Sequence, residues 1–487
     1  MTMNWWVLRR RPHVSWLIAI LCVAVLVGIY LAKQLQISQL SSTTLLLTGL
    51  MLIGVTLWQR YVYLIPLLIF GGMIIGLWRG SVNNNELSSV RGLYGMSGLV
   101  SGKVLDDVDS DVSGQSVVRL GELSIGGQVL RGTFWVTASS ELDIKRGDLI
   151  GVEGKIGPGF GSFVGTIYRA QIKQVQRPQP GDIARQFRDW FADAVRRAIP
   201  DPESSLGLGY LVGQKRALPA DLIEALKIAG LTHIVVASGY NLTVLVRLAR
   251  RLFEKLSKYL AALSASAMIA GFVAITGLSP SMTRAGLVAG LSLAAWYYGR
   301  RFHPLVLLPI AAAITVLMKP GYLWGDLGWQ LSFAAFAGVM ILAPLLQRFF
   351  FGETKPSFVR QILGETVSAL ILTAPILISG FGQISNVAIV ANLLVLPLVP
   401  LAMLLTFISG VGALIIPALS VILALPATWL LGYMIWVTES LSKLPWAVSA
   451  VQLSSVGVAI CYLVIIAACV YLWRATKYNL GESNIVE

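Results

Sequence analysis

The chain has 487 residues, of which 56% are hydrophobic and only 13% are charged, and its formal net charge is +14. Soluble globular domains carry about 25% charged residues, so this composition excludes a soluble globular protein and predicts a multi-pass membrane protein. The three histidines lie far apart and exclude a zinc site built on clustered histidines, and the three cysteines lie inside apolar runs. We therefore expect neither a metal nor a cofactor, and no enzymatic activity.

Three apolar runs within residues 1–80 predict three transmembrane helices, at 14–32, 43–58 and 61–78. The first run follows three arginines, but it is too long for a signal peptide and lacks a small-residue cleavage site. The arginines place the N-terminus in the cytoplasm, because positively charged flanks stay inside. Three spans from an inside start put the next segment outside the cytoplasm.

Residues 96–178 change character, because apolar residues now alternate with polar ones in about five short runs separated by glycine-rich turns. This period of two predicts strands, and five strands of this length fit a small closed barrel such as the OB-fold. OB-folds often bind single strands through aromatic and basic side chains. The candidate DNA contacts are Arg119, Arg131, Trp135, Lys145, Lys155, Tyr168 and Arg169. The alternative is that the aromatic residues form the core and the charges form a solvated face.

Residues 181–200 predict an amphipathic helix, capped by Asp182, with apolar residues at helical spacing and arginines opposite. The exposed Trp and Phe side chains fit a helix lying on the outer membrane surface, and packing against the barrel is an equal alternative. Two short helices are expected next, at 204–213 and 219–229.

Residues 204–474 predict a polytopic transmembrane domain, followed by a polar cytoplasmic tail at 475–487. A basic cluster from Arg247 to Lys258 fits a cytoplasmic loop. Spans are predicted near 259–277, 282–299, 304–319, 328–347, 361–379, 418–438 and 451–473. The run 386–417 is interrupted by LPLVP and predicts a broken or re-entrant half-span followed by a full span. The fold class is thus a polytopic α-helical membrane protein with an inserted all-β, OB-fold-like domain outside the cytoplasm.

Four polar stretches interrupt the apolar half: AGLTHIVVASGYN, TGLSPSMTRAG, GDLGWQLSF and APILISGFGQISNVAIVANLLVLPLVP, the segment 374–400. Polar side chains at membrane depth must face protein or water, so they are candidates for the lining of a polar path. These candidates are His233, Ser238, Tyr240, Asn241, Arg284, Asp326, Trp329, Gln330 and Asn392. The alternatives are that Arg284 and Asp326 pair with each other or with headgroups, and that the glycines serve helix packing.

In order and spacing, the four stretches resemble the competence domain of the ComEC family, the inner-membrane proteins of natural transformation. The N-terminal spans, external OB-like domain and amphipathic helix match that family's layout over nearly the whole chain. The resemblance implies a plasma-membrane channel that passes single-stranded DNA into the cytoplasm. It also implies an extracytoplasmic DNA receptor and a cytoplasmic ATPase as partners, besides membrane lipid and an optional second copy in a homo-oligomer.

The sequence departs from the family pattern at two points. Asn241 stands where the family commonly has histidine, so a titratable role is in doubt there while hydrogen bonding is preserved. The H-x-H-x-D-H motif of the metallo-β-lactamase-like domain in longer members does not occur, and no Walker-type loop occurs either. Degradation of the other strand and the energy for transport are therefore expected from separate proteins.

The same residues suggest two alternative functions, an intramembrane hydrolase and a secondary transporter. In an intramembrane hydrolase Ser238 would be the nucleophile and His233 the base, but they lie five residues apart, on different faces of a regular helix, and have no evident third group. In a secondary transporter of a small solute, the broken span near LPLVP would hold the site. A solute carrier has little use for an external OB-like domain, which favours the strand channel.

Overall fold

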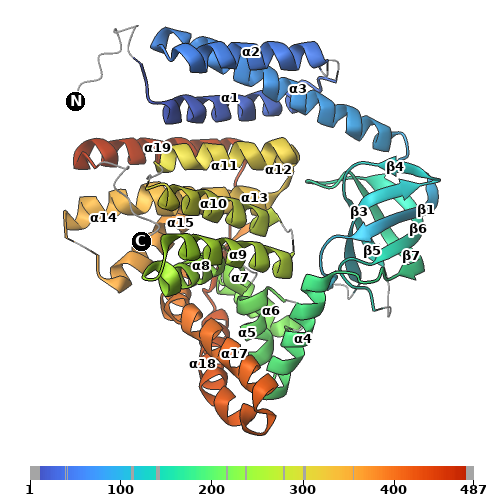
Figure 1. Ribbon diagram of the computed structural model, residues 1–487, viewed down its shortest axis with the longest axis vertical. Coiled ribbons are helices and arrows are strands. Elements are labelled where there is room, and N and C mark those ends of the chain that lie inside the picture. The colour runs from blue at the N-terminus through green and yellow to red at the C-terminus, as the bar shows by residue number, and fades with distance from the viewer. Residues whose placement is uncertain are drawn as a thin grey trace. The chain divides into compact units, whose positions relative to one another are not determined.

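The computed structural model describes residues 11–478 apart from 39, 41, 111–114, 139–142, 215–217, 236–238, 278–279, 300–302 and 355 (Figure 1). The chain divides into two compact units. Unit 1 contains Met1–Gly181 and Phe302–Gln330, and unit 2 contains Asp182–Arg301 and Leu331–Glu487.

Within the described ranges, eight helical segments are long and apolar enough to cross a membrane: Val14–Gln34, Val62–Arg91, Lys258–Thr276, Leu327–Phe351, Phe358–Phe381, Ala388–Ile415, Pro417–Ser442 and Ser455–Thr476. Two shorter apolar helices cover Thr43–Gln59 and Leu305–Met318. Nine of these ten coincide with single predicted spans, because long apolar runs specify helices in hydrocarbon. The tenth, Ala388–Ile415, covers the run that was expected to be broken, and the predicted span 282–299 corresponds to the helix Pro280–Tyr297, which is not one of the ten. The predicted class, a multi-pass helical membrane protein, is confirmed.

Glycines set the packing of α1 (Val14–Gln34) against α3 (Ile65–Arg91) in unit 1. Gly72, Gly76 and Gly80 recur every fourth residue on α3 and face Ala24, Gly28 and Ala32 of α1. A Cβ at Gly76 would lie 2.3 Å from the Val25 carbonyl oxygen, so only glycine allows this approach. Small residues at such spacing are the usual means of close helix contact in membranes. Helix α2 (Thr43–Gln59) packs on the other side of α3.

Helix α3 is longer than the predicted span 61–78, because it continues through the polar residues 83–86 to Arg91. At a rise of about 1.5 Å per residue its 27 residues reach about 40 Å, beyond the hydrocarbon thickness. The Asn84 side-chain amide donates to the carbonyl oxygens of Ala32 and Ile37 at 3.0 and 2.9 Å and so caps the end of α1. Glu86 receives a hydrogen bond from Arg131 at 2.6 Å, tying α3 to the β domain.

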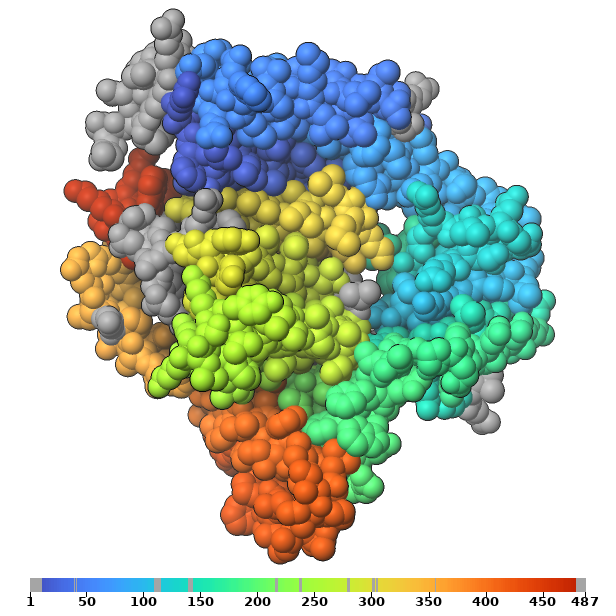
Figure 2. Space-filling model, in the orientation of Figure 1, coloured from blue at the N-terminus to red at the C-terminus, as the bar shows by residue number. Residues whose placement is uncertain are grey.

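The β domain is a closed barrel with the OB-fold connectivity. Its strands are β1 (Ser97–Val104), β2 (Asp109–Ser110), β3 (Ser116–Ile125), β4 (Gln128–Leu130), β5 (Phe134–Ala138), β6 (Leu149–Pro158) and β7 (Gly165–Gln176). The pairing runs β1–β6–β7–β5–β3, and β3 returns to β1. Strands β5 and β7 are parallel, and the other pairs are antiparallel. The space-filling view shows one face of the barrel, coloured light blue to teal (Figure 2).

The five strands predicted from the alternation are present, with one difference. The run 128–139 is split into β4 and β5 at Gly132, whose φ of +120° is a conformation that side-chain-bearing residues rarely adopt. The barrel core contains Val100, Leu120, Leu123, Val136 and Ile150, all at most 1% exposed. Alternate residues of each strand point inward, as the period of two requires.

Unit 2 is helical. After α4 (Ile183–Ala198) its elements are α5 (Glu203–Val212), α6 (Ala220–Ile228), α7 (Thr232–Val235), α8 (Gly239–Glu254), α9 (Lys258–Thr276), α10 (Pro280–Tyr297), the main part of α13 (Leu327–Ala337), the π-helix Gly338–Leu342, α14 (Ala343–Phe351), α15 (Phe358–Phe381), α16 (Ala388–Val395), α17 (Val399–Ile415), α18 (Ser420–Ser442) and α19 (Ser455–Thr476). A small ladder pairs β8 (Gln383–Ser385) with β9 (Val448–Ala450). Its largest core is built from α4–α7 and α16–α18.

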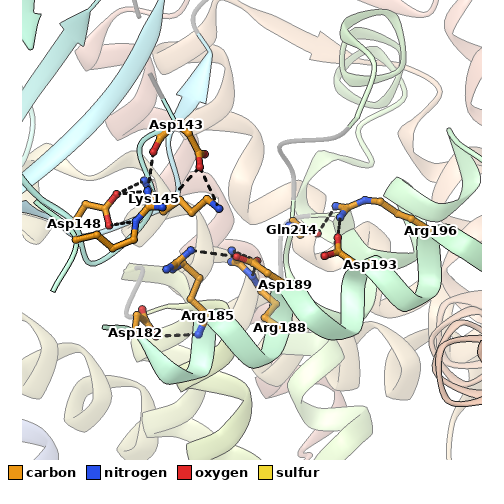
Figure 3. Close-up of polar contacts among 11 residues, drawn as sticks. Asp143, Lys145, Asp148, Asp182, Arg185, Arg188, Asp189, Asp193, Arg196 and Gln214 are labelled. Carbon is orange, nitrogen blue, oxygen red and sulfur yellow. Dashed lines mark hydrogen bonds and ion pairs between the residues drawn. The ribbon is translucent and has the colours of Figure 1, made fainter. Parts of the chain in front are cut away.

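The predicted amphipathic helix is present as α4, and its apolar stripe divides into two parts. Phe191, Val195 and Ala198 are buried in the core of unit 2, and the Phe191 ring stacks on Phe407 of α17 at 5.9 Å. Ile183, Phe187 and Trp190 are exposed by 66%, 54% and 53%. Arg185 and Arg188 are buried and both pair with Asp189 (Figure 3). Half of the stripe thus anchors α4 in the helical unit.

The interruption at LPLVP is a kink and does not end the helix. Leu396–Leu398 forms a 3₁₀ turn between α16 and α17, and the helical stretch Ala388–Ile415 has 28 residues. Pro397 removes a backbone donor but keeps a helical φ, so the chain tightens for one turn and then continues. The expected half-span followed by a separate full span is therefore replaced by one kinked helix.

Replacing Gly76 by Ala should destabilise the protein by about 1–3 kcal/mol, because the new methyl group would overlap the backbone of α1. The matched control is Gly54→Ala on α2, where a Cβ meets nothing within 4 Å. The control should gain up to about 1 kcal/mol from helix propensity. Thermal unfolding in detergent measures both. Equal midpoints for the two variants would contradict the packing role.

Candidate functional site

An aromatic cluster lies on the β domain beside the end of β5. The rings of Trp135, Phe160 and Phe163 contact one another with centroids 5.2–5.4 Å apart. The Arg119 guanidinium lies over the Trp135 ring at 5.9 Å, and its Nη1 donates to Asp106 at 3.0 Å. Two predicted DNA-contact residues, Arg119 and Trp135, are thus brought together. Aromatic faces with an adjacent arginine are the usual elements of a base-stacking surface.

The loop that carries Phe160 and Phe163 is seated on α12 (Tyr322–Gly325), in the same unit. A Cβ on Gly161 would lie 2.5 Å from the Gly325 carbonyl oxygen, and Gly161 has a φ of +60°. A Cβ on Gly325 would in turn lie 2.1 Å from the Gly161 carbonyl oxygen. Glycine is required on both sides, because a side chain at this contact would separate the two segments. The contact places the aromatic cluster next to α12 and the end of α11, within unit 1.

Lys319 connects the β domain to the segment that contains α11 and α12. It follows α11 (Pro304–Met318), donates to the Thr133 hydroxyl at 3.2 Å, and its ammonium lies 5.5 Å from the centre of the Tyr322 ring. Burial lowers the pKa of Lys319, the carboxylates of Asp106 and Asp326 act to raise it, and Arg119 lowers it further. Lys319 was not among the predicted residues, although a lysine at the end of an apolar run is a visible signal.

The predicted candidates Asp326, Trp329 and Gln330 stand at the start of α13, each with a local partner. Asp326 accepts from the Trp329 backbone N–H at 2.6 Å and so caps the helix. The Trp329 indole donates to the Thr315 hydroxyl of α11 at 3.0 Å, and the Gln330 amide donates to the Leu323 carbonyl oxygen at 3.2 Å. The motif GDLGWQ therefore fixes the turn from α12 into α13.

The remaining β-domain candidates lie apart from the aromatic cluster. Arg131 pairs with Glu86, and Lys145 pairs with Asp143 at 3.2 Å beside the Asp148–Arg177 ion pair (Figure 3). Lys155, Tyr168 and Arg169 are exposed on β6 and β7. Residues 96–178 contain nine lysines and arginines and nine aspartates and glutamates, so the domain carries no net charge.

In unit 2, the first polar stretch touches two of the others. Gly230, with a φ of +71°, packs against Ala388 of α16, where a Cβ would lie at 2.8 Å. A Cβ on Gly239, at the start of α8, would lie 3.4 Å from the Ala285 methyl group, next to Arg284 on α10. Segments separated by as many as 158 residues in sequence thus meet around α7 and the start of α8.

Polar residues at this junction differ in exposure. Asn241 is fully buried, and its amide donates to the carbonyl oxygens of Tyr210 at 2.9 Å and Ile234 at 3.4 Å, joining α5, α7 and α8. His233 and Tyr240 are exposed, Tyr240 by 42%. Ser238 lies outside the described residues. Asn241 therefore fixes the junction, while His233 and Tyr240 are accessible on it.

Arg284 and Asn392 are buried near the same junction. Arg284 is 3% exposed and donates to the Ser281 hydroxyl at 3.1 Å. Asn392 is 2% exposed and donates to the Ala388 carbonyl oxygen at 2.7 Å, one helical turn earlier. Its own amide oxygen accepts no hydrogen bond from any residue that the structure describes. Both residues remain candidates for a polar path.

Glu365 is a candidate site residue that was not predicted from the sequence. It lies in α15, is half-buried, and interacts electrostatically with both Tyr240 and Arg247 of α8. Gln361 donates to its carboxylate at 2.9 Å. A carboxylate inside a predicted span is a candidate by position alone. It extends the polar junction to α15 and offsets the charge of Arg247.

Comparison with known proteins identifies the family to which this chain is similar. A model of the competence protein family matches residues 210–475, which is more than half of the chain. ComE operon protein 3 of Bacillus subtilis (strain 168) is 23% identical over 219 residues, covering 44% of this chain and 27% of that relative. The match thus spans about a quarter of the relative's length, and no solved structure matches the chain. The matched region contains all four polar stretches and the helices that bring three of them together, and on this evidence the chain belongs to the competence protein family.

Proposed function

We propose that this protein forms the path by which one strand of DNA crosses the plasma membrane during natural transformation. The observation that carries the proposal is the contact, within unit 1, between the aromatic cluster of an OB-type barrel and the segment that contains α11 and α12. Trp135, Phe160 and Phe163 offer faces for bases, and Arg119 and Lys319 offer cations for phosphates. The family match gives independent support for a role in DNA uptake.

The cations near the aromatic cluster are offset by nearby carboxylates, which would keep a transported strand from binding too tightly. A conducting site has to bind well enough to admit its substrate and weakly enough to release it. Arg119 is offset by Asp106, and the charge of Lys319 is offset by Asp106 and Asp326. Stacking on aromatic rings contributes about 1–3 kcal/mol per base and tolerates any sequence. We infer that the strand is guided by stacking while the paired cations prevent it from being trapped.

In unit 2, we assign polar groups at and beside the α7–α8 junction to the same path. His233 and Tyr240 are neutral donors, and Arg284 and Arg247 are fixed cations, the latter offset by Glu365. The barrel is expected outside the cytoplasm and both termini inside. The proposed partners are single-stranded DNA, membrane lipid, a separate DNA receptor, a separate ATPase and a separate nuclease.

Deletion of the gene should abolish entry of labelled DNA into the cytoplasm, while DNA bound at the cell surface stays at the level of the parent strain. Protection of the label from added nuclease distinguishes the two pools. If the deleted strain still internalises DNA, the proposed function is wrong. If it takes up DNA normally but fails to accumulate a small solute, the transporter alternative is correct.

Reversing the charge of Lys319 should lower DNA uptake about tenfold, the effect of losing one charge-assisted contact of about 1.5 kcal/mol. Lys319→Glu places a carboxylate beside Asp106 and Asp326, where it also repels phosphate. Lys155→Glu on β6 makes the same change on another part of the barrel and should have little effect. A larger loss in Lys155→Glu than in Lys319→Glu would move the DNA contact to the β6–β7 surface.

Removing the Arg284 cation should abolish uptake while the amount of folded protein in the membrane stays normal. Because Arg284 is buried, Arg284→Lys is needed to separate charge from packing, and it should retain part of the uptake. Arg250→Ala, which removes another buried arginine from unit 2, is the stability control. Unchanged uptake in Arg284→Ala would remove this residue from the path.

A further inference from the structure

A groove between α9 and α10 lies outside every residue assigned to the DNA path. Its volume is about 510 Å³, and its walls are the small or apolar residues Ala262, Leu263, Ser266, Ile269, Ala270, Gly290, Leu293 and Ala294. A Cβ on Gly290 would meet nothing within 4 Å, so the groove is open at that point. From Tyr259 to Ala270 it follows 11 residues of helix, about 16 Å, which matches most of a phospholipid acyl chain.

One end of the groove is polar and basic. Tyr259, Tyr297 and Tyr298 line it there, and Tyr259 and Tyr298 are exposed by 63% and 74%. The ammonium of Lys258 lies over the rings of Trp296 and Tyr297 at 5.8 and 5.6 Å. Arg251, Lys255 and Lys258 are all exposed in this turn, against the single acidic residue Glu254. Tyrosine and tryptophan at such an end are typical of the headgroup level of a membrane.

We propose that this groove is a binding site for an anionic phospholipid, with one acyl chain along α9 and α10 and the headgroup phosphate beside Lys258 and the tyrosine hydroxyls. The groove's shape fits any lipid chain, but the exposed positive charge at one end favours an anionic headgroup over a zwitterionic one. Each lysine or arginine near a membrane surface adds about 1 kcal/mol of attraction for anionic lipid. A second copy of the chain would fit the apolar walls but not this concentration of like charge.

Native mass spectrometry of the whole protein, released from mixed micelles containing equal amounts of phosphatidylglycerol and phosphatidylcholine, tests the site. The wild type should retain one phosphatidylglycerol about fivefold more tightly than phosphatidylcholine. Lys258→Gln should retain a lipid with that preference lost, whereas Lys443→Gln, at the end of α18, should behave as the wild type.

Gly290→Leu fills the groove and should remove the tightly held lipid. Gly271→Leu on α9, where a Cβ also meets nothing within 4 Å, is the matched control and should keep it. If Gly290→Leu fails to give a monodisperse protein, Ala294→Leu makes the same test from the next turn of α10. Equal retention of the two lipids by the wild type overturns the proposal, as does unchanged retention in the groove-filling variants. A dimer that Gly290→Leu abolishes also overturns it and identifies a second copy as the occupant.

Discussion

Hydrocarbon supplies no hydrogen bonds, so each polar group that the chain carries into the membrane must find a partner within the protein. Asn241 shows the consequence most clearly, since its side-chain amide on α8 donates to backbone carbonyl groups of α5 and α7 and so joins the three helices. Asn392 and several threonines instead donate to the carbonyl one turn earlier in their own helix. The buried polar groups therefore divide into those that join helices and those that satisfy themselves locally, and accessible residues such as His233 and Tyr240 form a third group.

Backbone contact is the second device on which the structure depends. The α1–α3 pair and the seat of the barrel loop on α12 both rely on glycines that meet another segment's backbone. Such contacts leave no room for side chains to adjust, and they hold the two backbones at direct contact distance. In unit 1 this fixed spacing holds the aromatic cluster beside the membrane helices.

Most of the fold could be predicted from the sequence, because two patterns of hydrophobic residues account for most of the elements. Long apolar runs specify the membrane helices, and alternation of polar and apolar residues specifies the barrel strands. The kink at Pro397 and the extension of α3 to Arg91 were harder to predict, since proline and polar residues end helices in some contexts and continue them in others.

The site was predicted less completely. Arg119 and Trp135 could be proposed from residue type, but their proximity to Lys319 depends on how a loop 25 residues after Trp135 lies against α12. Glu365 was visible as a charge in an apolar span, yet its partners on α8 follow from tertiary packing alone.

The electrical neutrality of the barrel has a consequence for the order of events. A protein that attracts DNA from a distance does so with excess positive charge, whose long-range field raises the encounter rate. This barrel has no such excess. Under the proposed function, the barrel would therefore be poorly equipped to attract DNA from a distance. Finding DNA and threading it would then be separate tasks: another component would deliver a free end at close range, and the barrel would select for unpaired bases, since only those expose faces on which its rings can stack.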